Sequence, residues 1–306
     1  MDHDRIYLCM EKYIKDMLNM LEVNTGRLTA TPIAKPIENT DRALNPTERK
    51  WFMSALGCCG WLTNTARPDI AYAHSRIAQH MANPTVSAME ATHRMLLYLR
   101  DHANLALSTH IWENDYSLCR MPDGSAPDSD SPYVWAVFCD SDFAGNQETQ
   151  NQHRSQNGFI AINCSGPVAW ASKVSSVAFA HPKIGQAHAD ISSGAAEVYA
   201  AGNAVNDTLH LSYVAEESGI EFPLPFTLQI DNAAAEAFIK RTAAKSRMKH
   251  IDCRQSWIKT LRDSEICIPV HVDTKYNLAD LFTKILDRAT FETLRDRIMQ
   301  PRERFD

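Results

Sequence analysis

The fold is decided by Tyr133-Val-Trp-Ala-Val-Phe-Cys-Asp140, an apolar run that ends in a carboxylate. A short, uninterrupted apolar run of this length predicts a buried strand. A second run, Phe226-Thr-Leu-Gln-Ile-Asp231, also ends in a carboxylate. Carboxylates that follow two strands of one sheet can converge in space, so we expect Asp140 and Asp231 to lie close together.

Two further acidic residues occupy comparable positions. Glu197 lies in a long helical segment that starts after Ser192-Ser193, and Asp280 is predicted to open a helix just after a third strand at 266–272. Carboxylate oxygens are hard ligands of the kind that Mg²⁺ and Mn²⁺ prefer. Two such ions, about 4 Å apart, can hold and cleave a phosphodiester. The four acids therefore predict a nuclease-type metal site.

The segments around the first run predict a mixed sheet. Strands are expected at 133–140, 157–164 and 166–173, with Ser165-Gly166-Pro167 as the hairpin turn between the second and third. Helices and strands then alternate along the chain. Three antiparallel strands followed by this alternation predict an α/β fold, a mixed five-stranded sheet with flanking helices.

The N-terminal part of the chain is predicted to be mainly helical. Apolar spacing and cap chemistry favour helices at 13–21, 45–62, 68–79 and 87–100, with a proline-containing connector after the first. A polar, turn-forming stretch at 121–132 is interpreted as a linker. We therefore expect a smaller helical domain at 1–120, the linker at 121–132, and the sheet domain at 133–306.

Composition limits the classes of protein that need to be considered. The 306 residues are 44% apolar and 22% charged, which is typical of a globular protein, and no apolar run reaches the 18 residues of a membrane span. The N-terminus lacks the pattern of a secretory or transit peptide. The eight cysteines show no Cys-x-x-Cys spacing and the twelve histidines form no zinc motif, so we expect core thiols in a reducing intracellular compartment.

The net charge argues against a protein that coats nucleic acids in general, but one local stretch of the chain is strongly cationic. The net charge is −6, whereas such coats are usually basic. Residues 240–249 carry five cations and no acid, and a histidine follows them. A phosphate backbone favours such a stretch, although a solvated helix face would explain it equally well. The candidate nucleic-acid-binding residues are Lys240, Arg241, Lys245, Arg247, Lys249 and His250.

Several blocks in fixed order resemble the C-terminal part of copia-type retrotransposon polyproteins, from the end of the reverse transcriptase through the ribonuclease H domain. The N-terminal blocks are Thr31-Pro32, the segment from Leu62 to Arg76, and Met95-Leu-Leu-Tyr-Leu-Arg100. The later blocks are Cys139-Asp-Ser-Asp-Phe-Ala-Gly145, Gly158-Phe159, Pro167-Val-Ala-Trp-Ala-Ser-Lys173, Ile230-Asp-Asn232, Lys249-His-Ile-Asp-Cys-Arg254 and Asn277-Leu-Ala-Asp-Leu-Phe-Thr-Lys284. Each block is weak alone, but the ordered set is specific and covers nearly the whole chain.

The resemblance implies a ribonuclease H-like fold preceded by a reverse-transcriptase remnant. It further implies a divalent-metal ribonuclease that cuts the RNA strand of RNA–DNA hybrids with two Mg²⁺ or Mn²⁺ ions. The metal-binding acids would be Asp140, Glu197, Asp231 and Asp280. His250 matches a residue of the family's motif, but the match gives it no role.

Two departures from the family pattern keep a second hypothesis open. No Asp-Asp dipeptide occurs in the chain, so the polymerase motif is absent and no polymerase activity is expected. In the helix that carries the acid, Ala195 stands where the family usually has a first Glu, and we align the ligand with Glu197. The alternative is a domesticated, non-catalytic ribonuclease H-like module that serves as a structural subunit of a larger, ribonucleoprotein-type assembly.

Simpler interpretations apply to individual residues. An Asp after a strand is often only a helix cap or turn former, which would explain Asp231 and Asp280. Residues 174–191 are predicted to form an inserted loop. Its His181, His188 and Asp190 can be interpreted as metal ligands, but solvated side chains or a partner contact explain them as well.

Overall fold

In the computed structural model, the chain forms two compact units. The first contains residues 1–111, 148–151 and 284–306, and the second contains residues 112–147 and 152–283. The domain boundaries expected from the sequence stay predictions. The structure describes residues 7–23, 25–38, 41–108, 135–146, 154–163, 166–175, 178–181, 185–188, 193–220, 222–240 and 252–302.

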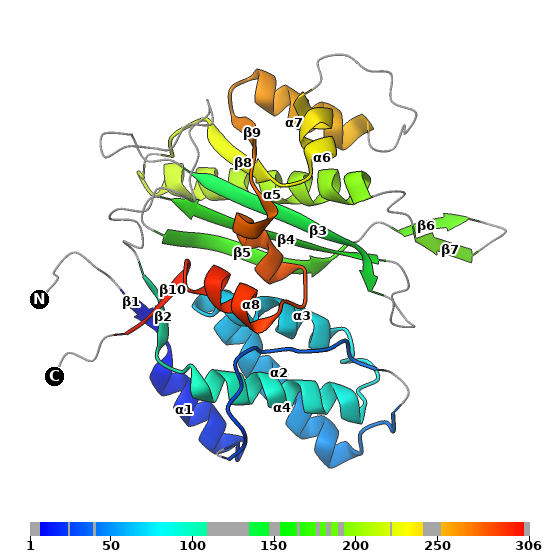
Figure 1. Ribbon diagram of the computed structural model, residues 1–306, viewed down its shortest axis with the longest axis vertical. Helices are drawn as coiled ribbons and strands as arrows, with labels where there is room; N and C mark the ends of the chain where they lie inside the picture. Colours follow the sequence, from blue (N-terminus) through cyan, green and yellow to red (C-terminus); the bar gives the residue numbers. More distant parts are fainter. Residues whose placement is uncertain are drawn as a thin grey trace, which may run out of the picture. The chain divides into compact units, whose positions relative to one another are not determined.

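The first unit is built mainly from helices (Figure 1). They are α1 (Glu11–Met20), α2 (Pro46–Thr65), the 3-10 helix η1 (Pro68–Ile70), α3 (Ala71–Ala78), α4 (Val86–Asp101) and α8 (Arg288–Arg295). The start of α2 follows from its sequence. Asn45 accepts a hydrogen bond from the Glu48 amide at 2.9 Å, and the Glu48 carboxylate accepts one from the Asn45 amide at 2.8 Å. This reciprocal capping satisfies two backbone donors at the helix end.

A small sheet in the first unit was not predicted from the sequence. Strand β2 (Leu105–Ser108) lies between β1 (Tyr7–Cys9) and β10 (Met299–Pro301), and both neighbours are antiparallel to it. Two of the strands come from near the two ends of the chain, and β2 lies about a hundred residues from the N-terminus. Their pairing is therefore a long-range property that local periodicity does not reveal.

A buried ion pair anchors the helices of the first unit. The Arg67 guanidinium donates to both carboxylate oxygens of Asp69, at 2.9 and 2.7 Å, and neither side chain is exposed to solvent. Tyr98 of α4 donates to Asp69 at 2.7 Å, and Arg67 also donates to the His102 carbonyl at 3.0 Å. Burial alone would raise the pKa of Asp69, but the adjacent Arg67 and Tyr98 outweigh it and lower that pKa. Asp69 is therefore held as a carboxylate.

A partly buried histidine, His74, predicts how this unit responds to acid. Burial lowers the pKa of His74, whose Nε2 lies 3.2 Å from the Leu56 carbonyl oxygen. A lowered folded-state pKa means that the full stability is present above the unfolded-state value of about 6.5 and is lost as the pH falls below it. We expect the urea midpoint of the first unit to fall between about pH 7 and pH 5, measured by hydrogen exchange of α2 and α3 peptides.

The control for this prediction is His74→Gln, which removes the titrating group. Its midpoint should fall less over the same pH range than that of the wild type. Some dependence should remain, because burial also lowers the pKa of His102. An identical pH dependence in the two proteins would show that His74 does not contribute.

The second unit contains a mixed five-stranded sheet, which confirms the predicted fold class. The strand order is β5 (Gly166–Val174), β4 (Arg154–Asn163), β3 (Ala136–Asn146), β8 (Phe226–Ile230) and β9 (Cys267–His271). The pairs β5–β4 and β4–β3 are antiparallel, whereas β3–β8 and β8–β9 are parallel. Strand β3 continues to Asn146, so Asp140 lies within the strand and not at its end as expected from the sequence.

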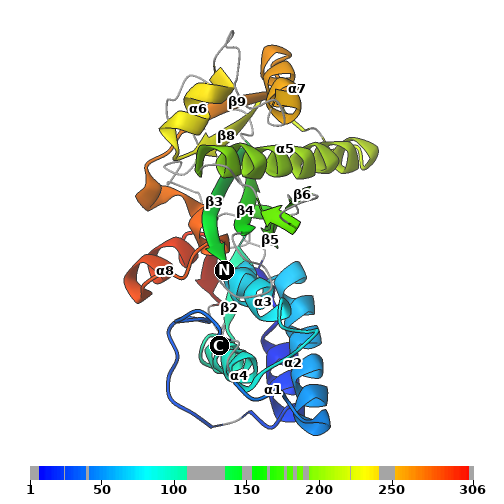
Figure 2. The same ribbon diagram turned by 90° about the vertical axis from the view of Figure 1, so that its right-hand side faces the viewer.

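Three helices accompany this sheet: α5 (Ser193–Glu217), α6 (Ala233–Lys240) and α7 (Asp252–Asp263). Figure 2 shows α5 running along the sheet, with α6 and α7 on the same side. Alternate β3 residues, Val137 and Cys139, share the core with Val198 and Val205 of α5. This packing brings the first turns of α5 to the middle of β3.

No helix in the described part of the chain is long and apolar enough to cross a bilayer.

The segment predicted as an inserted loop contains a strand pair. Residues Ala178–His181 form β6 and residues Gly185–His188 form β7, paired antiparallel as a separate two-stranded sheet. Asp190 and the connecting residues 182–184 lie outside the described residues. The segment therefore has secondary structure of its own.

Candidate metal centre

Three of the predicted acids come together in the second unit. Asp140 on β3, Glu197 near the start of α5 and Asp231 directly after β8 each contribute one carboxylate oxygen, and these oxygens all lie within 4.8 Å of one another. Asp140 is 1% exposed and Glu197 is 6% exposed. The group therefore collects negative charge where water is largely excluded, an arrangement that a cation stabilises.

The charges of the three carboxylates affect the pKa of the buried Cys139 thiol. Its pKa is raised well above the ordinary value, first by burial and then by the charges of Glu197, Asp140 and Asp231. A single buried thiol thus lies in the field of all three carboxylates. Glu197 is the α5 acid that joins this group, and its alignment with the metal-binding acid of the family stays a prediction.

The geometry and the donor set fit a hard divalent cation. Mg²⁺ binds carboxylate oxygens at about 2.0–2.1 Å, so two ligands on opposite sides of one ion are about 4.2 Å apart. Oxygens within 4.8 Å of one another need only small side-chain movements to share an ion. The three residues offer only oxygen ligands, which favours Mg²⁺ or Mn²⁺ over zinc.

Helix capping does not account for Asp231 or Asp280. Asn232 accepts the backbone amides of Ala234 and Ala235 at the start of α6, at 3.0 and 3.1 Å. In the same way Asn277 accepts the Ala279 amide at 3.1 Å. The two asparagines therefore cap these helices, a role for which the sequence alone had also allowed the aspartates.

Asp280 lies outside the group of three. It sits inside the short 3-10 helix η4 (Leu278–Phe282), which Asn277 caps, so the prediction that Asp280 opens this helix was wrong. The side chain is 6% exposed, and its helix contacts β3 through Asn277, which donates to the Cys139 carbonyl at 3.2 Å. Its role as a fourth metal ligand stays a prediction.

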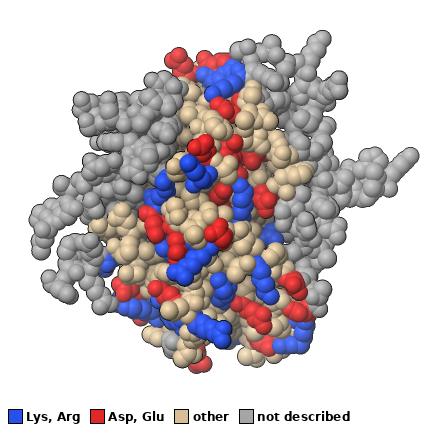
Figure 3. Space-filling model, in the orientation of Figure 1, with Lys and Arg blue, Asp and Glu red and all other residues tan. Residues whose placement is uncertain are grey.

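Most of the predicted nucleic-acid-binding residues lie outside the described part of the chain. These are Arg241, Lys245, Arg247, Lys249 and His250. Lys240 is described: it ends α6, is exposed, and its Nζ is 2.5 Å from a carboxylate oxygen of Glu236. Figure 3 shows acidic and basic side chains interspersed over the described part of the face that it presents.

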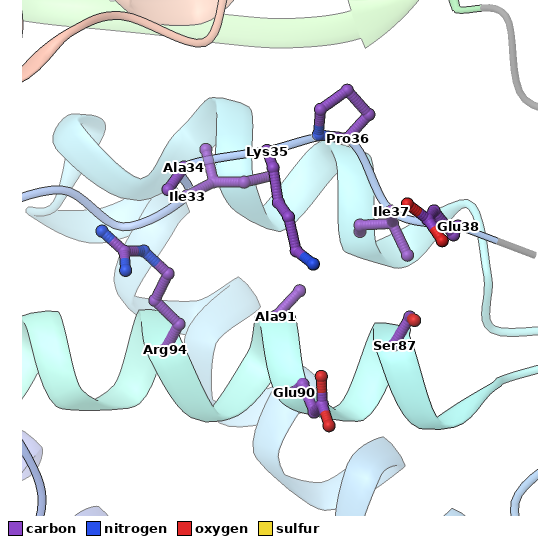
Figure 4. Close-up of a pocket in the computed structure, with 10 residues that line it drawn as sticks. All are labelled: Ile33, Ala34, Lys35, Pro36, Ile37, Glu38, Ser87, Glu90, Ala91 and Arg94. Atoms are coloured by element: carbon purple, nitrogen blue, oxygen red, sulfur yellow. The ribbon is translucent and has the colours of Figure 1, made fainter. Parts of the chain in front are cut away.

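A pocket in the first unit has a different character. It has a volume of about 270 Å³ and lies between the connector at 33–38 and helix α4. Figure 4 shows the Lys35 side chain reaching toward Ala91, with Arg94 on one side and Glu38 on the other. Cations and carboxylates line the same space, so the pocket favours no single ligand charge.

The fold and the acidic group together define a ribonuclease H-like unit with a candidate acidic metal site. The chain is 27% identical over 297 residues to the retrovirus-related Pol polyprotein from transposon RE1 of Arabidopsis thaliana, and 25% identical over 299 residues to that from transposon TNT 1-94 of Nicotiana tabacum. These matches cover 96% and 95% of this chain but only 18% and 20% of the relatives. Copia-type retrotransposon Pol polyproteins are thus homologues of nearly the whole chain, which spans about a fifth of their length.

Solved structures give a weaker likeness. An LC11-RNase H1 in complex with an RNA/DNA hybrid is 14% identical, with a TM-score of 0.34, over 49% of this chain and 93% of that one. RNase H1 from Halobacterium salinarum is 16% identical, with a TM-score of 0.32, over 49% and 94%. The strand order and directions of the sheet, and not these scores, carry the fold assignment. No protein-family model matches the chain.

Proposed function

We propose that the second unit is a divalent-metal ribonuclease that cleaves the RNA strand of RNA–DNA hybrids. The spacing of Asp140, Glu197 and Asp231 supports this most, because three carboxylate oxygens within 4.8 Å can share cations. The homologous Pol polyproteins and the sheet topology support the choice of nucleic-acid chemistry. Asp280 is proposed as the fourth ligand, since it lies on a short helix that contacts β3 beside Asp140.

In this reaction a water oxygen forms a bond to the scissile phosphorus while the bond to the leaving ribose oxygen breaks in line. Two Mg²⁺ or Mn²⁺ ions, when bound, supply charge for the attacking and leaving oxygens. The protein fixes the carboxylates on a strand, a helix and a strand end, so their geometry is set before substrate arrives. The burial of Asp140 and Glu197 limits access of bulk water and strengthens the field at the reacting phosphate.

A cavity along α5 supports contact with a nucleic-acid backbone. It has a volume of about 520 Å³, and its lining includes Lys173 of β5, Trp257 of α7, and Asn203, Asn206 and Asp207 of α5. The Lys173 ammonium lies 3.4 Å from a carboxylate oxygen of Asp207, so part of its charge is already paired. Lysine and asparagine side chains commonly contact phosphate and sugar, and aromatic rings stack on bases. These groups recognise a backbone without reading its sequence. The cationic stretch that starts at Lys240 is proposed to add charge to this contact.

The test uses hybrids labelled on either strand, incubated with Mg²⁺ or Mn²⁺. We expect cleavage of the RNA strand only, complete inhibition by a chelator, and no cleavage of double-stranded DNA. Primer extension should be absent, because the chain has no Asp-Asp motif. A metal-free rate equal to the metal-dependent rate, or no cleavage at all, would contradict the proposal and favour the non-catalytic module.

A further inference from the structure

We propose that Thr283 is a positioning residue that fixes the orientation of the Asp140 carboxylate. We further propose that Gly158, which has no side chain, allows the segment 277–283 to approach the sheet closely enough for this contact. The inference rests on the proposed function in taking Asp140 as a metal ligand. It adds two residues, neither of them acidic, to the determinants of the site.

The segment 277–283 is attached to β3 at both of its ends. At one end Asn277 donates to the Cys139 carbonyl at 3.2 Å, and at the other the Thr283 hydroxyl donates to the Asp140 carboxylate. Asn277 and Thr283 are both completely buried. Two adjacent residues of β3 are therefore held by one segment that lies well over a hundred positions away in the sequence.

Gly158 explains how the segment can come so close. It pairs with Asp140 in the β3–β4 register. A Cβ atom at position 158 would lie 2.6 Å from the Cβ of Phe282 and 2.8 Å from the Cγ2 of Thr283. Separations this short do not occur between packed carbon atoms, so any side chain here would push the Thr283 hydroxyl away from Asp140.

A third attachment comes from β5. Ser172 donates to the Phe282 carbonyl at 2.6 Å, and Gln156 of β4 in turn donates to the Ser172 hydroxyl at 2.8 Å. Hydrogen bonds to β3 and β5, with close packing on β4, thus fix the backbone that leads into Thr283. The hydroxyl is presented from a rigid position and not from a mobile loop.

Orientation matters because the terminal torsion of aspartate is broad and has no single sharp minimum. A hydroxyl bonded to one carboxylate oxygen restricts rotation and so directs both oxygens. It does this without adding charge, which leaves the negative potential of the group intact. Partners of this kind typically change metal affinity by about 10–100-fold when they are removed.

The test compares Thr283→Val, which keeps the shape and removes the hydroxyl, with Thr283→Ser, which keeps the hydroxyl. Mn²⁺ affinity is measured by calorimetry on the full chain, beside hybrid cleavage. We expect Thr283→Val to bind Mn²⁺ about 10–100-fold more weakly, and Thr283→Ser to remain close to wild type. Circular dichroism and the urea midpoint of each variant establish that it is folded.

Gly158→Ala provides an independent variant, since it should weaken Mn²⁺ binding by displacing the Thr283 hydroxyl, without removing any polar group. Mn²⁺ affinity in Thr283→Val equal to wild type would overturn the inference, whether or not hybrids are cut. Loss of Mn²⁺ affinity in Thr283→Val, with no cleavage even by wild type, would uphold the positioning role and refute the proposed function. A wild-type protein that binds no Mn²⁺ would refute both.

Discussion

Replacement of Asp140 by asparagine is expected to reduce metal-dependent cleavage of the hybrid by roughly 10³-fold, since loss of several kcal/mol of metal-mediated stabilisation corresponds to about that factor. Asparagine has nearly the same shape and still accepts a hydrogen bond from Thr283. It removes only the charge, at a position that is 1% exposed. The rate is measured with saturating hybrid over a range of Mn²⁺ concentrations.

The matched control is Asp263→Asn, the same change at the end of α7. Asp263 is 64% exposed and forms an ion pair with Arg262 at the surface. Exposed pairs contribute little to stability, so this variant should cleave at the wild-type rate. Equal rates for Asp140→Asn and wild type would remove Asp140 from the reaction.

The largest expected effect on stability comes from Asp69→Ala in the first unit. The change leaves the Arg67 guanidinium completely buried without its carboxylate and removes the acceptor of the Tyr98 hydroxyl. An uncompensated buried charge of this kind costs about 3–5 kcal/mol. The measurement is the urea dependence of hydrogen exchange in α4 peptides, which should shift to much lower urea.

The control is Arg288→Ala, which breaks the exposed pair between Arg288 and Glu292 on α8. Its exchange should follow that of the wild type, because a solvent-screened pair at the surface contributes little. If Asp69→Ala also exchanged like the wild type, the buried pair would not be a determinant of stability.

Local chemistry was sufficient to predict much of this structure. Strand β8 occupies the five positions expected for it, and α2 begins at the capping box that the sequence displays. Both features depend on neighbouring residues alone, namely hydrophobic pattern and cap donors. The same reasoning located Asp231 at the end of β8, where the acidic group forms.

The features that were missed depend on contacts between distant residues. The β1–β2–β10 sheet joins segments from three parts of the chain. Thr283 and Asp140 are 143 residues apart, and only the packed sheet brings them together. Gly158 gave a signal that could have been used, since a glycine inside a strand often marks a close approach by another backbone.

The most direct test of the acidic group is the position of Mn²⁺, located by its anomalous scattering in crystals soaked with the ion. We predict Mn²⁺ coordinated by carboxylate oxygens of Asp140, Glu197 and Asp231 at about 2.1 Å. The prediction would be contradicted if crystals soaked with saturating Mn²⁺ showed an intact sheet but no ion shared by these three carboxylates.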